Sequence, residues 1–149
     1  MSQKPQIFLL SVGLMTMSAC DDPFVFAAGG ELTGRVEAAP QRWQFDEKSA
    51  LAQLETRPEA PYSVNFSYVQ LDGRLYAYAG DTRTNWVEHI DHDPRVRVRV
   101  KGTIYPAHAV RVVSDEELAQ FAEVWAALSS FQRDPMRFKE VWLYRLEQR

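Results

Sequence analysis

The sequence predicts an α+β domain: an antiparallel sheet or barrel of about six strands, with a helix between the last two. Three observations carry this prediction. Apolar and polar residues alternate on both sides of an Asp72-Gly73 turn, and Arg and Val alternate strictly over residues 95–100. A helical stripe of apolar residues then follows Ser114 and precedes a final apolar segment at 140–146.

The region before the first alternating segment has weaker signals. Between residues 31 and 45, apolar residues stand among turn residues, which indicates one or two short strands. Asp46 has the character of a helix N-cap, and Ala50, Leu51 and Leu54 follow at helical spacing before Pro58. We therefore expect a short helix here, acting as a lid or plug.

Residues 62–79 predict a β-hairpin. Every second residue from Tyr62 to Tyr68 is apolar, as in a half-buried strand. The Asp72-Gly73 pair favours a two-residue turn, and Leu75 to Ala79 returns antiparallel.

A polar loop at 80–84 and a short helix at 85–92 follow, and Asp93-Pro94 ends that helix. The strand 95–100 directs three valines to a core and three arginines outward, to a solvated face. Lys101-Gly102 turns the chain into a strand over 103–113, where Pro106 marks an edge or bulge.

Residues 114–117, Ser-Asp-Glu-Glu, form a capping box, in which Ser114 caps the helix and Glu117 reaches back to the Ser114 amide. The helix that follows places an apolar stripe on a sheet. The stripe consists of Leu118, Phe121, Ala122, Trp125 and Leu128. Residues 140–146 read as the last strand.

The N-terminus indicates export. An apolar run from Ile7 to Met17 follows Lys4 and is too short to span a bilayer. Met17-Ser18-Ala19-Cys20 resembles the bacterial lipobox, Leu-(Ala/Ser)-(Gly/Ala)-Cys. The resemblance implies a signal peptide at 1–19, a lipidated tether at 20–30 beginning with Cys20, and a domain at 31–149. The alternative is an ordinary secretory signal, or an uncleaved anchor, with an incidental cysteine.

Asp21 directly after the lipidated cysteine resembles the enteric retention signal for the inner membrane. It implies the periplasmic face of that membrane as the protein's location. Cys20 is also the chain's single cysteine. The folded part therefore has no disulfide, no thiolate zinc site and no cysteine nucleophile.

The charge and the histidines exclude further classes. A net charge of −3 argues against nucleic-acid binding, which needs a concentrated basic face. His89 and His92 lie three residues apart among carboxylates, but a zinc site needs a third ligand and supporting groups. We interpret these residues as a charged helix terminus and predict no metal site. No Ser-His-Asp arrangement is evident, and the sequence identifies no catalytic residue.

The segment from Gly80 to Val113 carries a resemblance to a known family. Two consecutive stretches resemble the split β-barrels that bind flavin mononucleotide (FMN) or deazaflavin. They are Gly-Asp-Thr-Arg-Thr-Asn-Trp-Val-Glu-His-Ile-Asp-His-Asp-Pro-Arg-Val-Arg-Val-Arg-Val and then Lys-Gly-Thr-Ile-Tyr-Pro-Ala. This family includes pyridoxamine phosphate oxidases and deazaflavin-dependent nitro- and quinone reductases. The resemblance implies a homodimer with the cofactor in the cleft between subunits.

The same resemblance implies cofactor-binding residues. Thr82, Arg83 and Asn85 would contact the phosphate, since hydroxyls, amides and a guanidinium near a helix start suit that group. Tyr78 or Trp86 would lie near the ring. Asp81, by contrast, places a negative charge in the same loop.

Two functions follow from these expectations. The first is a membrane-tethered FMN- or deazaflavin-dependent oxidoreductase, which reduces a quinone-like or other small acceptor. The second is a cofactor-free module derived from the split barrel, which binds a small-molecule ligand or a partner in the envelope.

Overall fold

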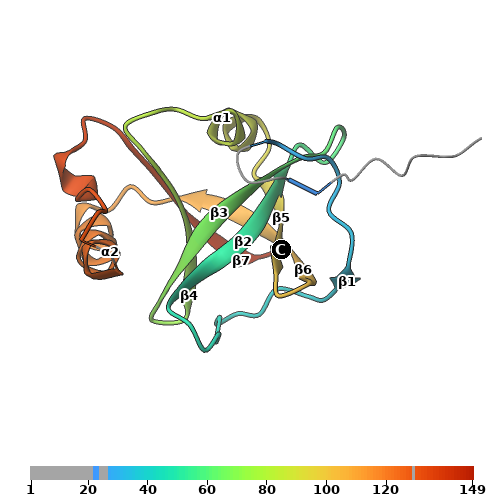
Figure 1. The fold of residues 1–149 in the computed structure, drawn as a ribbon, viewed down its shortest axis with the longest axis horizontal. Coiled ribbons are helices and arrows are strands. Elements are labelled where there is room, and N and C mark those ends of the chain that lie inside the picture. Colours follow the sequence, from blue (N-terminus) through green and yellow to red (C-terminus); the bar gives the residue numbers. More distant parts are fainter. Residues whose placement is uncertain (1–21, 24–26, 129) are drawn as a thin grey trace, which may run out of the picture.

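The computed structural model describes residues 22–23, 27–128 and 130–149 (Figure 1). The predicted signal peptide, Cys20 and part of the tether lie outside the described residues. The helices are α1 (Asn85–His92), α2 (Asp115–Leu128) and a 3₁₀ turn, η1 (Pro135–Arg137). The strands are β1 (Arg35–Val36), β2 (Ser49–Thr56), β3 (Tyr62–Leu71), β4 (Arg74–Gly80), β5 (Arg95–Val100), β6 (Thr103–Arg111) and β7 (Val141–Gln148).

The strands form one sheet in the order β1-β6-β5-β2-β3-β4-β7, and a further pairing of β6 with β7 closes strands β2–β7 into a barrel. These six strands pair antiparallel, whereas the two-residue β1 runs parallel to β6. Helix α2 lies between the last two strands in sequence. The predicted α+β barrel with about six strands is confirmed.

The helix expected after Asp46 is wrong, because residues 49–56 form strand β2. Ala52 and Leu54 belong to the barrel cluster, whereas Leu51 is exposed and Gln53 points to the outer face, so the side chains alternate with a period of two. Ala, Leu, Gln and Glu all favour helices, and this local preference hid the alternation. Pairing with β3 on one side and β5 on the other decides the conformation of the segment.

The other predicted elements are found near their expected bounds. Strands β3 and β4 form the predicted hairpin, with Asp72 and Gly73 at positive φ in its turn. Helix α1 and strand β5 match the prediction, and the three valines of β5 are buried. Pro106 pairs in register with Arg97 of β5, and on its other side it lies between the β6 residues that pair with β1 and those that pair with β7.

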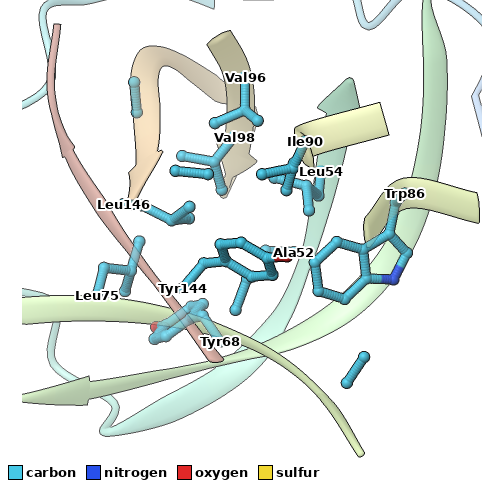
Figure 2. Packing of buried hydrophobic residues seen from close by; sticks show 14 of the residues in the cluster. Ala52, Leu54, Tyr68, Leu75, Trp86, Ile90, Val96, Val98, Tyr144 and Leu146 are labelled. Carbon is cyan, nitrogen blue, oxygen red and sulfur yellow. The ribbon is translucent and has the colours of Figure 1, made fainter. Parts of the chain in front are cut away.

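Two apolar clusters hold the domain together. The larger one fills the barrel, and Trp86, Val87 and Ile90 of α1 close one end of it (Figure 2). The smaller one lies outside the barrel, where Phe121 of α2 packs with Tyr76 and other residues on the outer face.

The predicted capping box of α2 is half right. Ser114 Oγ accepts the Glu117 backbone N–H at 3.3 Å. The Glu117 carboxylate does not bond the Ser114 amide, however, and instead meets the Tyr76 hydroxyl (2.7 Å) and Arg145 (2.7 Å). A buried carboxylate next to two donors on the sheet gains more from them than from an exposed amide.

The solvated arginine face expected for β5 is also wrong. Two arginines of this face bond to the N-terminal segment at Asp22, Glu31, Leu32 and Thr33. The Arg97 and Arg99 side chains are accordingly only 24% and 13% exposed. Arg97 forms an ion pair with Glu55, a buried residue of β2. The sequence pattern fixes which way the arginines point, but not which segment covers them.

Candidate functional site

The loop between β4 and α1 holds three of the predicted site residues. Thr82, Arg83 and Asn85 are all exposed there. Thr84 is the N-cap residue of α1, yet its side chain makes no capping hydrogen bond. The first backbone N–H groups of a helix lack intrahelical partners and carry a partial positive charge. The loop therefore presents donors suited to an anion.

Arg83 is held by a neighbouring carboxylate. Its guanidinium donates to Asp91 Oδ2 at 2.5 Å, with both side chains about half exposed. Asp91 also accepts the Tyr144 hydroxyl at 3.3 Å, and Arg111 lies over the Tyr144 ring. An ion pair this exposed contributes little free energy, so a bound anion can displace Asp91 from Arg83.

The structure does not bring Tyr78 and Trp86 to this loop as free ring surfaces. Tyr78 lies outside the barrel beneath α2, where it packs against Phe121 and Trp125. Trp86 lies in the barrel cluster, 7% exposed, with its edge toward Tyr144. The two rings therefore belong to different clusters, and both are used in packing.

Burial raises the pKa of the Tyr78 hydroxyl to about 12, and the carboxylates of Asp134 and Asp81 add to the effect. That hydroxyl is buried without a hydrogen-bond partner, as are Thr84 Oγ1 and Gln132 Oε1. A buried polar atom that lacks a partner carries a free-energy cost unless water or a ligand satisfies it. The Tyr78 hydroxyl lies beside Gly80, Thr84 belongs to the loop after β4, and Gln132 belongs to the segment after α2.

A cleft that the sequence analysis missed lies beside this loop. It is an open hollow with a volume of about 620 Å³, lined by Asp81 of the loop, the end of α2 and the segment that leads through η1. Its lining includes Asp81, Gln132, Arg133, Arg137 and Phe138. These residues come from segments more than forty positions apart, and only the packing of α2 joins them. The Asp134-Pro135 pair marked a loop in the sequence, but nothing in its spacing indicated a cleft.

The opposite end of the barrel has a charged groove near the β3–β4 turn, with two adjoining hollows of about 440 and 510 Å³. Its arginines are engaged. Arg74 and Arg145 bond Glu117, and Arg42 donates to the Asp72 carbonyl. The hydrogen-bond donors of this groove mainly attach α2 to the barrel, so they are less available to a ligand.

The two histidines of α1 have different surroundings. His89 Nδ1 shares a hydrogen bond of 2.9 Å with Thr56 Oγ1, and its ring meets Tyr62 edge-on. Burial lowers the pKa of His89, and the nearby Arg57 lowers it further. His92 is exposed. Within the described part of the chain, no group of three or more His, Cys, Asp and Glu side chains is arranged to hold a metal ion.

No protein-family model matches the chain, and neither does any curated protein sequence. Solved structures do resemble it. A candidate pyridoxamine 5′-phosphate oxidase from Listeria innocua has a TM-score of 0.52 at 13% identity, over 66% of this chain and 82% of that one. A NimC/NimA family protein from Clostridium acetobutylicum has a TM-score of 0.48 at 16% identity, over 64% and 70% of the two chains.

The identities are low, so the likeness concerns fold alone. The barrel order, the hairpin of β3 and β4, and the position of α2 before the last strand were described above from this chain's own residues. Together with the Listeria innocua structure, they confirm the fold that the sequence resemblance implied. The chain folds as a split β-barrel of the pyridoxamine phosphate oxidase-like type.

Proposed function

We propose that this protein is an envelope lipoprotein whose split barrel is a cofactor-free ligand-binding module. Its ligand is a small anionic molecule that meets the loop 80–84 and the adjoining cleft. One observation carries the proposal: the donors of the predicted phosphate side are exposed, while Trp86 is buried and Tyr78 is half-buried in packing beneath α2.

The donor set does not fit a whole flavin. Thr82, Arg83 and Asn85 suit a phosphate at the start of α1. An isoalloxazine ring needs an open apolar surface, but Tyr78 is covered by α2 and Trp86 fills the barrel end. The site within this chain therefore matches the anionic part of such a cofactor and not its ring.

The likeness in fold supports a second function. The Listeria innocua neighbour is named as a candidate oxidase of pyridoxamine 5′-phosphate. Thr82, Arg83 and Asn85, to which the resemblance assigns the phosphate, are exposed at or just before the start of α1. On this alternative, the protein is an FMN- or deazaflavin-dependent oxidoreductase, and a second copy of the chain supplies the ring surface in a homodimer cleft.

Ligand titration separates the two functions. The protein is purified in detergent, its visible absorbance is recorded, and its melting temperature is followed with added inorganic phosphate, FMN and deazaflavin. If the protein is a cofactor-free module, it should be colourless, and added phosphate should raise its melting temperature by mass action. The Arg83→Ala variant should lose the shift, whereas Arg35→Ala, which changes an exposed arginine on β1, should keep it.

A yellow protein, or a shift with FMN or deazaflavin far larger than with phosphate, would favour the oxidoreductase. No shift with any of the three anions would refute the proposed ligand class. Sedimentation of the same sample tests the homodimer.

The lipid anchor is a separate part of the proposal. It rests on the lipobox resemblance at Met17–Cys20, and Asp21 favours the periplasmic face of the inner membrane. Among the described residues, no helix is long and apolar enough to cross a bilayer. A Cys20→Ser variant should accumulate as unprocessed precursor. Normal processing and membrane association of that variant would refute the anchor.

A further inference from the structure

The segment that follows the proposed lipid anchor is bonded to the outer face of β2, β3 and β5. Glu55, whose side chain is 4% exposed, accepts the Leu32 backbone N–H at 2.6 Å. Arg97 donates to both Glu55 oxygens and, at 3.0 Å, to the Leu32 carbonyl. A buried carboxylate and a guanidinium thus clamp the backbone of this segment from both sides.

The start of the segment is held as well. Arg99 forms an ion pair with Asp22 at 2.9 Å and donates to the Thr33 carbonyl at 2.9 Å. Asn65 donates to the Pro23 carbonyl at 3.1 Å. Gln53 connects the two, since it accepts from Arg99 and donates to Asn65. Hydrogen bonds across three strands therefore fix Asp22 and Pro23 on this face.

Covalent geometry then limits where the anchor can be. Cys20 precedes Asp22 by two residues. Consecutive Cα atoms are about 3.8 Å apart, so the Cα of Cys20 lies within about 7.6 Å of that of Asp22. A lipid on Cys20 therefore enters the bilayer next to the outer face of β2, β3 and β5.

An exposed apolar side chain lies on the surface beside Asp22. Leu51 is 66% exposed and lies on the same face of β2 as Gln53, two residues away. Ser67, the β3 partner of Leu51, is exposed beside it. An exposed apolar side chain gains free energy when it leaves water for the membrane interface.

We propose that this face of the barrel, marked by Leu51 and Ser67, rests on the lipid bilayer. The inference depends on the proposed lipidation of Cys20. Helix α2 and the N-terminal segment lie at opposite ends of the molecule (Figure 1). The start of α2 should then lie farther from the bilayer than Leu51 does.

The test measures depth in the bilayer. Lipidation consumes the thiol of Cys20, which is the single cysteine, so a Leu51→Cys variant carries one free thiol for a fluorophore. The full-length, lipidated protein is placed in phosphatidylethanolamine–phosphatidylglycerol vesicles containing nitroxide-labelled lipid. The probe at 51 should be strongly quenched. A matched probe at Val113→Cys, an 88% exposed position just before α2, should not be quenched.

A second variant tests the ion pair that holds Asp22 on this face. Arg99→Gln removes the ion pair to Asp22, and it should abolish the quenching at position 51 while the protein stays membrane-bound. Equal quenching at 51 and 113 in lipidated protein would overturn this inference and leave the proposed anchor intact. An unlipidated Cys20, seen in the mass of the purified protein, would overturn the anchor itself.

Discussion

Glu117 is a buried carboxylate that joins α2 to the barrel. It accepts the Tyr76 hydroxyl at 2.7 Å and forms ion pairs with Arg74 (3.2 Å) and Arg145 (2.7 Å). Burial, together with the hydrogen bond to Glu117, raises the pKa of Tyr76 to about 12. The hydroxyl therefore stays a donor over the whole physiological range.

A Glu117→Ala substitution should lower the free energy of unfolding by about 2 kcal/mol, because it strands a buried hydroxyl and leaves guanidiniums without a carboxylate. The arginines are partly exposed, and water limits the loss. Urea unfolding measures the change. Glu116→Ala, an exposed acid in the same turn, is the matched control. An equal effect of both variants would contradict the role of the network.

His89 predicts a pH dependence of stability. Its pKa is lowered in the folded state, so the unfolded chain binds the proton first as the pH falls. The contribution is present above the ordinary pKa of about 6.5 and is lost as the pH drops through the lower, folded value. Melting temperature measured between pH 8 and pH 5 should fall less in His89→Gln than in the parent. The melting temperature of His92→Gln should fall with pH as much as that of the parent. If it falls as little as that of His89→Gln, the assignment to His89 is refuted.

At the scale of elements, the two helices begin in different ways. The Ser114 side chain caps α2 through the Glu117 N–H, whereas the Thr84 side chain makes no capping bond at α1. The same kind of residue at the same helical position thus has two roles. At α1 the hydroxyl is buried without a partner.

Paired substitutions test this difference. Ser114→Ala should cost about 1 kcal/mol of unfolding free energy, as the loss of an N-cap does. Thr84→Val keeps the shape and removes a hydroxyl that has no bond, so its stability should equal or exceed the parent's. Thermal or urea unfolding of the two variants decides the matter. A larger loss for Thr84→Val would show that its hydroxyl has a partner such as water.

Gly34 shows a backbone requirement of the N-terminal segment. Its φ is +152°, and a Cβ there would lie 2.7 Å from the Gly102 carbonyl oxygen. Because that oxygen belongs to the backbone, Gly34→Ala should displace β1 from β6 and lower the melting temperature. Amide hydrogen exchange should then increase at residues 35–37. Unchanged exchange would contradict the close approach.

At the scale of the whole molecule, barrel closure makes stability a shared property. The β6–β7 pairing joins residues far apart in sequence, and Trp43 Nε1 donates to the Leu146 carbonyl at 2.8 Å across the barrel end. Helix α2 packs outside, in its own cluster with Tyr76 and Leu143. The Glu117 network joins the two parts.

We therefore expect one cooperative unfolding transition. Tryptophan emission, which reports largely on the barrel interior, and circular dichroism at 222 nm, which reports largely on the helices, should give the same urea midpoint. Two separate midpoints would show that α2 unfolds independently of the barrel.

Much of the fold could be predicted from local signals. The Asp72-Gly73 hairpin, the alternation in 95–100 and the cap at Ser114 depend on residues close in sequence. Of the candidate site, the loop with Thr82, Arg83 and Asn85 was predicted as a group, but the cleft formed by α2 and η1 was not. The role of these residues as a cofactor site stays a prediction.

The sequence by itself determined the barrel class and the faces of its alternating strands, and the lipobox resemblance, with the export that it implies, stays a prediction. Tertiary structure decided that residues 49–56 are a strand, that Glu117 faces Tyr76 and that Arg97 and Arg99 hold the N-terminal segment. The physical reason is the distance in sequence over which each interaction acts. Periodicity and turns are local, whereas the partner of a buried charge or of a strand with helix-favouring residues is set by packing across the barrel.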